Sequence, residues 1–217
     1  MESLILYFHP LSSFCWKPLI ALYENGTAFT PRNIFLGDPA ERAELTALWP
    51  MAKLPVLRDE AKRRTIPEST TIIEYLDLHY PGPSRLIPAD PDAAIKVRLR
   101  DRFFDNYVMH PMFLQVGDRL RPADKKDPYG VEQARGTLRT ALDLVEKQIE
   151  GLTWSMGDVF TMADVSAAPS LFYADKVMPY ADSHPHTMAY LKRLMARPSF
   201  ARTLKEAEPV FHMFPQG

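Results

Sequence analysis

A run of prolines near the middle of the chain limits its fold more than any other feature of the sequence. Prolines stand at positions 81, 83, 88 and 91, with a glycine at 82. Because proline lacks a backbone N–H and restricts the residue before it, neither a helix nor a central strand can continue through such a stretch. The chain has 217 residues, enough for two modest cores. We therefore expect two domains, residues 1–80 and 92–217, joined by a linker over residues 81–91.

The first 80 residues alternate between strand and helix patterns. Short apolar or β-branched runs predict strands over residues 4–8, 29–36, 54–57 and 63–66. Apolar residues at helical spacing predict helices over about 14–25, 39–48 and 67–80. The polar turn at 59–62 would close a hairpin between the last two strands. The expected order is βαβαββα, and the near-continuous apolar run at 4–8 predicts a strand buried on both faces of a sheet with parallel pairing.

Every periodic segment after the linker has the spacing of a helix. These segments cover roughly residues 92–120, 129–150, 162–175, 186–196 and 199–207. In the third, Thr161 can cap the helix and Asp164 can bond back to the cap. The small residues at 166–168 predict that this helix lies deep, with close neighbours. The second domain is therefore predicted to be an all-α helical bundle.

The composition excludes several classes of function. Twenty-six basic and 27 acidic residues leave a net charge of −1, so no global field attracts nucleic acid or an anionic membrane surface. The apolar runs are far shorter than the roughly 20 residues of a membrane helix. The N-terminus lacks the basic segment and cleavage site of a secretory signal. We expect a cytoplasmic protein without a nucleic-acid or membrane partner.

The cysteine and histidine content argues against disulfides and metals. Cys15 is the single cysteine, which excludes an internal disulfide framework and a multi-cysteine zinc site. The six histidines lack a close set of partner ligands, so we expect no metal. With only nine glycines, we find no phosphate-binding glycine loop or nucleotide fingerprint.

Four segments resemble, in order and spacing, the cytosolic glutathione S-transferases. Residues 7–17 and 20–22 resemble the first strand, active-site loop and first helix of bacterial-like members with the theta/zeta-class serine motif. Residues 53–57 resemble the cis-proline strand, 67–76 the start of the glutathione-binding helix, and 160–164 the capping box of the helical domain. The resemblance implies a thioredoxin-like glutathione-binding domain and an all-helical domain that carries the electrophile site. It also implies glutathione as co-substrate and a homodimer.

Ser12 is the candidate catalytic residue. It lies between a strand end and a helix start, where unpaired N–H groups and the helix dipole favour an anion. A hydroxyl that donates to a sulfur anion stabilises the thiolate by about 1.5 to 3 kcal/mol, or one to two pKa units. The resemblance implies this role for Ser12. Ser13 can face the sulfur instead, either serine can simply cap the helix, and Pro18, which departs from the family pattern, leaves the aim of Ser12 open.

Cys15 is a rival nucleophile. The segment 12–15 has the spacing of a Cys-x-x-Cys redox motif with serine in the attacking position, and a thiol near a helix N-terminus can have a lowered pKa. The fourth position of that motif points toward the core, however, where a lone cysteine behaves as a small hydrophobe. We expect Cys15 to be inert. A reactive Cys15 would instead favour disulfide exchange with glutathione.

Five residues are candidates for holding glutathione. The resemblance implies a cis peptide at Leu54-Pro55, which turns the backbone of Leu54 toward the cysteinyl part of the ligand as an added strand would. Lys53 can bind the glycyl carboxylate or be merely solvated. Ser69 can hold the γ-glutamyl carboxylate and Glu68 its ammonium, at a helix start. The alternative is ordinary capping by Ser69, with Glu68 favoured by the helix dipole.

The second substrate is expected between the two domains. The segment 103–112 contributes aromatic and methionine side chains, namely Phe103, Phe104, Tyr107, Met109 and Met112. Tyr107 can also donate a hydrogen bond to the electrophile. Because such residues on a helix are more often core than pocket, we expect one or two of the five to contact the ligand.

The residues together favour a glutathione transferase that activates the thiol and conjugates it to apolar electrophiles, as in detoxification. Two alternatives stay open. One is a glutathione-dependent isomerase of the maleylacetoacetate-isomerase type, and the other is a non-catalytic binding or regulatory protein on the same fold.

Overall fold

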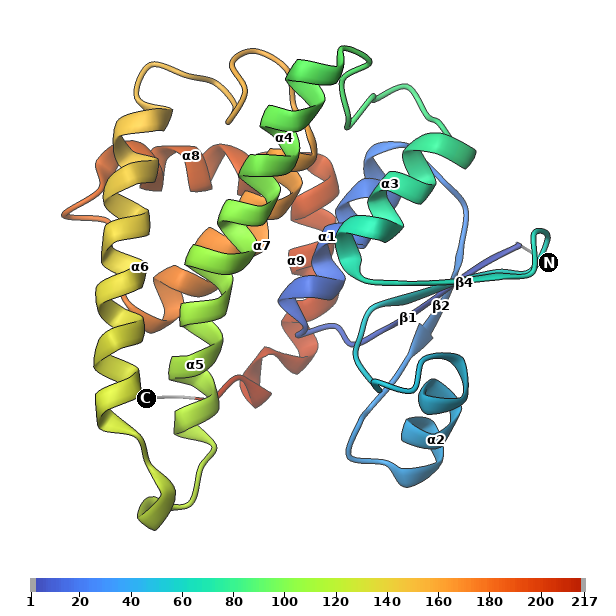
Figure 1. Ribbon diagram of the computed structural model, residues 1–217, viewed down its shortest axis with the longest axis horizontal. Coiled ribbons are helices and arrows are strands. Elements are labelled where there is room, and N and C mark those ends of the chain that lie inside the picture. The colour runs from blue at the N-terminus through green and yellow to red at the C-terminus, as the bar shows by residue number, and fades with distance from the viewer. Residues whose placement is uncertain (1–2, 216–217) are drawn as a thin grey trace.

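The computed structural model describes residues 3–215, which form a small sheet with three helices beside a bundle of further helices (Figure 1). The strands are β1 (Leu4–Phe8), β2 (Thr30–Asn33), β3 (Val56–Asp59) and β4 (Arg64–Pro67). The helices of the first part are α1 (Ser13–Glu24), α2 (Pro39–Leu48) and α3 (Ser69–His79). Those of the second part are α4 (Pro91–Phe103), α5 (His110–Arg119), α6 (Pro128–Ile149), α7 (Met162–Val177), α8 (Pro185–Ala196) and α9 (Pro198–Ala207). The predicted fold class, a thioredoxin-like α/β part followed by an all-helical part, is confirmed.

The four strands lie in the order β2-β1-β3-β4. The strand β1 pairs in parallel with β2 and antiparallel with β3, and β3 and β4 form the predicted hairpin. Helices α1 and α3 cover one face of the sheet and α2 the other (Figure 1). On β1, Leu4 and Leu6 are fully buried, whereas Ile5 and Tyr7 are only partly covered. The expectation that β1 is buried on both faces is therefore met on one face, because the short α2 covers less of the sheet.

Several element boundaries differ from the predictions. The strand β2 covers only Thr30–Asn33, and β3 begins at Val56, after the buried Pro55. The long helix expected over 92–120 contains a π-helical segment at Phe104–Met109, between α4 and α5. Pro111 follows this segment and has no N–H to bond the carbonyl of Tyr107, so the regular α-helical ladder cannot continue there. Short 3-10 turns, which were not predicted, occur at Ala123–Lys125 and Glu208–Met213.

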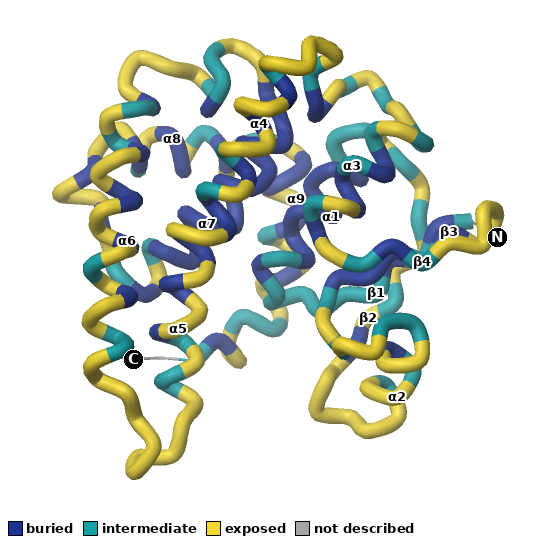
Figure 2. The backbone as a smooth tube through the Cα atoms, viewed as in Figure 1, coloured by how far each residue is buried: buried dark blue, intermediate teal, exposed yellow. Residues whose placement is uncertain are grey.

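Helix α1 lies inside the molecule, between the sheet and the helical part (Figure 2). Every residue from Cys15 to Leu22 is buried, so the helix has no solvent face over that stretch. Its Trp16 packs on Phe172 and Tyr173 of α7 and on Phe200 of α9. One cluster of buried apolar residues thus runs through both parts. The division into domains at residues 81–91 stays a prediction, although residues 80–90 contain no helix or strand.

The start of α7 has the predicted capping box. Thr161 is the N-cap, and Asp164 accepts from the backbone N–H of Thr161 at 2.8 Å. The same carboxylate also accepts from the backbone N–H of Ser155 at 2.7 Å and from the hydroxyl of Tyr190 at 2.5 Å. Asp164 is fully buried, and so is α7 over most of its length, as the small residues at 166–168 predicted. The carboxylate therefore ties α8 and the loop before α7 to the centre of the bundle.

Asp164→Ala is expected to lower the free energy of unfolding by about 3 kcal/mol, because it leaves buried donors of Ser155, Thr161 and Tyr190 without an acceptor. Urea denaturation followed by circular dichroism measures the loss. Asp158→Ala, which removes an exposed carboxylate from the preceding loop, is the control and should change stability by less than about 0.5 kcal/mol. Equal losses in the two variants would contradict the role of the buried carboxylate.

Candidate functional site

The two serines lie at the start of α1, and neither hydroxyl caps the helix. Ser12 is the N-cap residue, with φ −77° and ψ 113°, yet its side chain makes no capping hydrogen bond. Its carbonyl accepts from the N–H groups of Cys15 at 2.9 Å and Trp16 at 3.2 Å. The Ser13 hydroxyl is buried and has no hydrogen-bond partner among the described residues. The capping alternative for this pair is therefore not observed, and the half-buried Ser12 hydroxyl is free of the helix backbone.

The loop that precedes Ser12 is held by side chains from both parts of the molecule. The indole N–H of Trp16 donates to the carbonyl of Pro10 at 2.5 Å. The hydroxyl of Tyr173, on α7, donates to the carbonyl of Leu11 at 2.7 Å. Because these two carbonyls directly precede Ser12, the helical part helps to set the direction in which residue 12 leaves the loop.

Cys15 is buried in the first turn of α1. Burial raises the pKa of its thiol to about 12, although hydrogen bonds with the Ser12 side chain and the His9 backbone oppose the rise. At neutral pH the group is therefore a neutral thiol. This agrees with the expectation that Cys15 packs as a small apolar residue.

The Leu54-Pro55 peptide bond is cis, as the resemblance implied. Leu54 precedes β3, and its backbone N–H and carbonyl have no hydrogen-bond partner within residues 3–215. Lys53 beside it is exposed and makes no ion pair with another described residue. A backbone edge and a free cation are therefore available next to each other before β3.

The start of α3 differs from ordinary capping. Glu68, not Ser69, is the N-cap residue, and its side chain makes no capping hydrogen bond. Glu68 has φ 70° and ψ 122°, in the left-handed half of backbone space that non-glycine residues rarely occupy. Such strained residues cluster at functional sites. Ser69 is the first residue of the helix and is nearly buried, with its backbone N–H at the anion-binding end.

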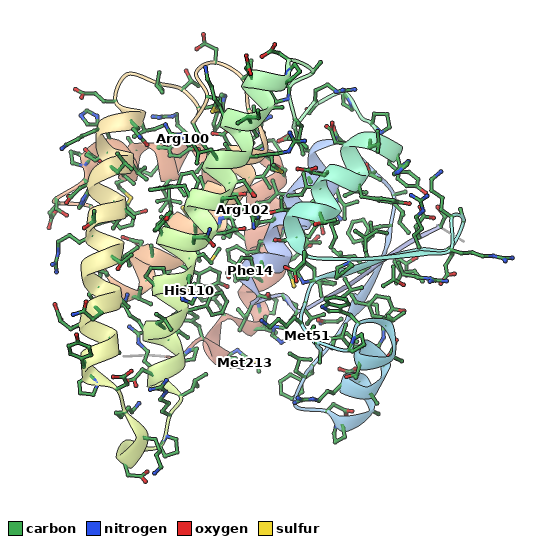
Figure 3. The ribbon with its side chains drawn as sticks, in the orientation of Figure 1. Phe14, Met51, Arg100, Arg102, His110 and Met213 are labelled. Carbon is green, nitrogen blue, oxygen red and sulfur yellow. The ribbon has the colours of Figure 1, made fainter. Side chains whose placement is uncertain are left out.

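A cavity of about 340 Å³ lies between the start of α3 and the helical part. Its wall combines the predicted pair Glu68 and Ser69 with residues of α1, α4, the π-helical segment and α5, among them Phe14, Arg102, Asp105 and His110. Figure 3 shows Phe14, Arg102 and His110 where the helical part faces α1 and α3. The cavity therefore presents both signs of charge, as a ligand with a carboxylate and an ammonium requires.

An aromatic pair connects α1 to α5 at one side of this cavity. The rings of Phe14 and Phe113 stack with centroids 5.5 Å apart and planes within 8°. Both side chains are partly exposed. Sequence reasoning did not single out this pair, nor Arg102, Asp105 and His110. Arg102, Asp105, His110 and Phe113 are three, five and three residues apart, and the five-residue step crosses the π-helical segment, so no regular helical spacing marked them in the sequence.

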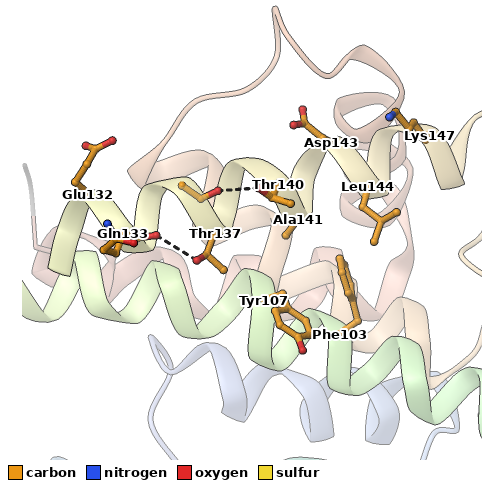
Figure 4. A pocket seen from close by; sticks show the side chains of 11 residues that line it. Phe103, Tyr107, Glu132, Gln133, Thr137, Thr140, Ala141, Asp143, Leu144 and Lys147 are labelled. Atoms are coloured by element: carbon orange, nitrogen blue, oxygen red, sulfur yellow. Dashed lines mark hydrogen bonds between the residues drawn. The ribbon is translucent and has the colours of Figure 1, made fainter. Parts of the chain in front are cut away.

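The aromatic and methionine residues predicted for the second substrate lie elsewhere. Phe104, Met109 and Met112 are buried in the core. Phe103 and Tyr107 line a groove of about 1080 Å³ between the π-helical segment and α6 (Figure 4). Tyr107 is therefore not brought together with Glu68 and Ser69, whose cavity it does not line. Its contact with an electrophile stays a prediction.

Residues 3–215 contain neither a cluster of metal-binding side chains nor a membrane-spanning helix. No group of three or more histidine, cysteine or acidic side chains is placed to hold a metal ion. No helix in that range is long and apolar enough to span a membrane.

Comparison with protein families matches both parts of the chain. Residues 6–84 match the family described as glutathione S-transferase, N-terminal domain, and residues 128–193 match glutathione S-transferase, C-terminal domain. Together the two matches cover two thirds of the chain.

Curated relatives carry several names. A glutathione S-transferase-like protein, LUC7, from Fusarium is 33% identical over 60% of this chain, which spans 59% of that protein. A stringent starvation protein A homolog from Coxiella burnetii is 29% identical over 94% of this chain and 92% of its own length. A probable maleylacetoacetate isomerase from Vibrio cholerae is 26% identical over 96% of this chain and 99% of its own.

Solved structures show the same fold. A glutathione S-transferase from Methylobacterium radiotolerans in complex with glutathione sulfonate has a TM-score of 0.82 and 26% identity, covering 99% of this chain and 95% of that one. A glutathione S-transferase from Methylobacillus flagellatus with glutathione bound has a TM-score of 0.84 at 24% identity, covering 93% of this chain and 98% of that one.

Cys15 is expected to react with iodoacetamide at less than about one hundredth of the rate of an exposed cysteine between pH 7 and 9, because its thiol is buried and stays protonated there. Mass spectrometry of the native protein measures the rate. The same protein in 6 M guanidinium, where Cys15 is exposed, is the control and should react completely. Rapid native labelling that increases from pH 6 to 8 would show a reactive thiolate instead.

Proposed function

The chain belongs to the glutathione S-transferase family, and on this premise we propose that it binds glutathione, lowers the pKa of its thiol through Ser12 and conjugates the thiolate to apolar electrophiles. The observation that carries the proposal is the hydroxyl of Ser12 at the N-terminus of α1, which does not cap the helix. A hydroxyl that does not cap the helix can donate to a sulfur anion, where the helix dipole adds its own stabilisation.

The groups around Ser12 supply the contacts that a tripeptide of this kind needs. The unpaired backbone of Leu54, beside Pro55, pairs with the cysteinyl unit as an added strand. Lys53 binds the glycyl carboxylate. Ser69 holds the γ-glutamyl carboxylate with its hydroxyl and N–H, and Glu68 meets the ammonium.

Ser13 contributes to the same loop without facing the sulfur. Its hydroxyl is buried, whereas Ser12 is only a partly buried residue. Among the two serines, Ser12 is therefore the thiol ligand. Ser13 lies behind it, at the first position of α1.

The electrophile lies against the stacked pair Phe14 and Phe113. Phe14 lines the same cavity as Glu68 and Ser69, so the stacked pair offers an apolar surface beside the bound peptide. Aromatic faces suit flat or apolar electrophiles of varied shape. A wall of this kind fits a detoxifying enzyme of the cytoplasm.

Two other functions have specific support. The likeness to the Vibrio cholerae protein over nearly its whole length favours a glutathione-dependent isomerase, in which glutathione adds to the substrate and is released again. The likeness to the Coxiella burnetii protein, whose name states no enzymatic activity, favours a non-catalytic regulatory protein. Product analysis separates the three: a stable conjugate, an isomer free of glutathione, or no turnover.

Ser12→Ala is expected to raise the pKa of the bound glutathione thiol by one to two units, because it removes a hydrogen bond worth about 1.5 to 3 kcal/mol to the thiolate. Ultraviolet absorbance of the thiolate during a pH titration of the complex measures the pKa. In conjugation assays with 1-chloro-2,4-dinitrobenzene, kcat/KM at pH 6.5 should fall about 10- to 100-fold.

Ser13→Ala is the matched control for that experiment. Replacing a buried hydroxyl that has no partner should leave the thiol pKa unchanged and stability equal or slightly higher. If Ser13→Ala shifts the thiol pKa and Ser12→Ala does not, the roles of the two serines are reversed.

The homodimer is proposed to form through the face around the groove between α4 and α6. Exposed apolar side chains gather there, namely Ile95, Leu99, Tyr107, Leu144 and Leu152. Apolar patches of this kind mark interaction surfaces.

Leu99→Asp is expected to weaken the dimer at least about 30-fold, because a charge buried in an apolar interface costs 2 kcal/mol or more. Sedimentation velocity at micromolar concentration measures the change. Leu120→Asp, an equally exposed leucine beyond the end of α5, is the control and should leave the dimer intact. A wild-type monomer, or dissociation by both variants, would refute this interface.

A further inference from the structure

A lysine is buried where the two parts of the molecule meet. The Lys17 side chain, on α1, has no exposed surface. Its ammonium lies 2.8 Å from Asp101 of α4 and 2.8 Å from both oxygens of Asp105 in the π-helical segment. It also donates to the hydroxyl of Thr70 on α3, at 3.1 Å. One ammonium therefore contacts three of the elements that form the wall of the proposed glutathione cavity, namely α3, α4 and the π-helical segment.

Two cations form ion pairs with both carboxylates, one at the surface and one in the interior. Arg102, whose side chain is half exposed, lies 2.7 Å from each of Asp101 and Asp105. Lys17 forms ion pairs with both carboxylates from the interior. Burying a charge costs several kcal/mol unless a partner compensates it, so the neutrality of the cluster depends on Lys17. Burial raises the pKa of Asp105 against the pull of Lys17. Burial acts in the same direction on Asp101, but the charge and hydrogen bond of Lys17, together with Ser166 and Arg102, lower the pKa of that carboxyl.

The cluster adjoins the cavity directly. Thr70 follows Ser69, the first residue of α3, and donates to Asp101 at 2.9 Å. Asp105 forms part of the cavity wall. Lys17 itself stands one turn beyond Ser13, at the start of α1. Any movement of these carboxylates therefore moves the starts of both helices that the proposed function assigns to glutathione.

We propose that Lys17 is a positioning residue for glutathione binding, which neutralises Asp101 and Asp105 and so holds the starts of α1 and α3 against the helical part. The inference rests on the proposed function, because it assumes that glutathione occupies this cavity. Lys17 touches no ligand, since it is fully buried. Without it, one cation is left for two carboxylates at close range, and the pair takes up a proton in place of the ammonium.

Uptake of this proton makes the effect of losing Lys17 depend on pH, whereas a loss of packing alone would not. In Lys17→Met the carboxylate pair is protonated and neutral at low pH, and it gains an uncompensated charge as pH rises. Because the folded form then binds more protons than the unfolded form, stability falls as pH rises from about 4 through the raised pKa of the pair. The binding defect should follow the same direction, small at low pH and large at neutral pH.

The other groups that face the cluster are the same in every variant. They are Glu68 and Thr70 on α3, Arg102 on α4, His110 on α5 beside the cavity, and Ser166 on α7, which donates to Asp101. A ratio of dissociation constants between variant and wild type at each pH removes their contribution.

The experiment uses S-methylglutathione as the probe, because its blocked sulfur has no proton to lose between pH 5.5 and 7.5. Calorimetry should show a dissociation constant about tenfold higher for Lys17→Met than for wild type at pH 7.5, and less than threefold higher at pH 5.5, as expected for linkage to one proton. The double variant Lys17→Met/Asp101→Asn, which leaves Arg102 to neutralise Asp105, should bind within about threefold of wild type at both pH values.

The outcomes separate this inference from the proposed function. A defect of Lys17→Met that is equal at the two pH values, or no defect at pH 7.5, overturns the positioning role alone. If Lys17→Met does not fold at pH 7.5, the proposal requires that it folds at pH 5.5 and that the double variant folds and binds at both; failure of either overturns it. If wild type does not bind S-methylglutathione, the proposed function fails, and this inference with it.

Discussion

The burial of α1 on all sides is the constraint on which the rest of the structure depends. A helix that packs on a sheet normally keeps a polar face for solvent. Here the residues from Cys15 to Leu22 pack against the sheet and α3 on one side and against α7 and α9 on the other. The start of this helix is therefore fixed by contacts from both parts of the molecule. The hydrogen bonds from Trp16 and Tyr173 hold the loop before Ser12 in place.

The features that could be predicted from the sequence are those with local causes. The order of strands and helices follows from apolar periodicity, and the start of α7 from a capping box that needs only Thr161 and Asp164. The start of β3 at Val56 and the π-helical segment before Pro111 depend on how the backbone meets its neighbours. The same holds for the apolar core. The sequence suggested one core on each side of the prolines, but one large cluster runs through both parts because α1 offers apolar side chains in every direction. A small second cluster, Ile34, Leu45 and Val56, lies between the sheet and α2.

The residues of the candidate site likewise fall into those that local sequence patterns indicated and those that they did not. The sequence pointed to one group of site residues because each of them stands beside a break in regular structure, where sequence motifs can be recognised. These residues are Glu68, Ser69, Leu54 and the serines at the start of α1. The facing residues Arg102, Asp105, His110 and Phe113 come from the middle of a long helix, whose rotation about its axis no local pattern determines. For the same reason, the sequence did not predict that Phe103 and Tyr107 lie in the groove beside α6. One sign was readable: Lys17 is the one charged residue between positions 13 and 23, in a stretch that is otherwise almost entirely apolar, and it pairs with Asp101 and Asp105.

The π-helical segment makes the length of this helix as important as its composition. Each bond from residue i to i+5 encloses one residue more than an α-helical bond, so α5 is rotated relative to a continuous α-helix. Deleting one residue between Phe104 and Met109 would turn everything beyond it by about 100° about the axis. His110 would then leave the cavity and Phe113 would leave Phe14, although no side chain that lines the site had been exchanged. An insertion or deletion at this point can thus alter which ligands the site accepts, a route to new specificity that a comparison of side chains alone would overlook.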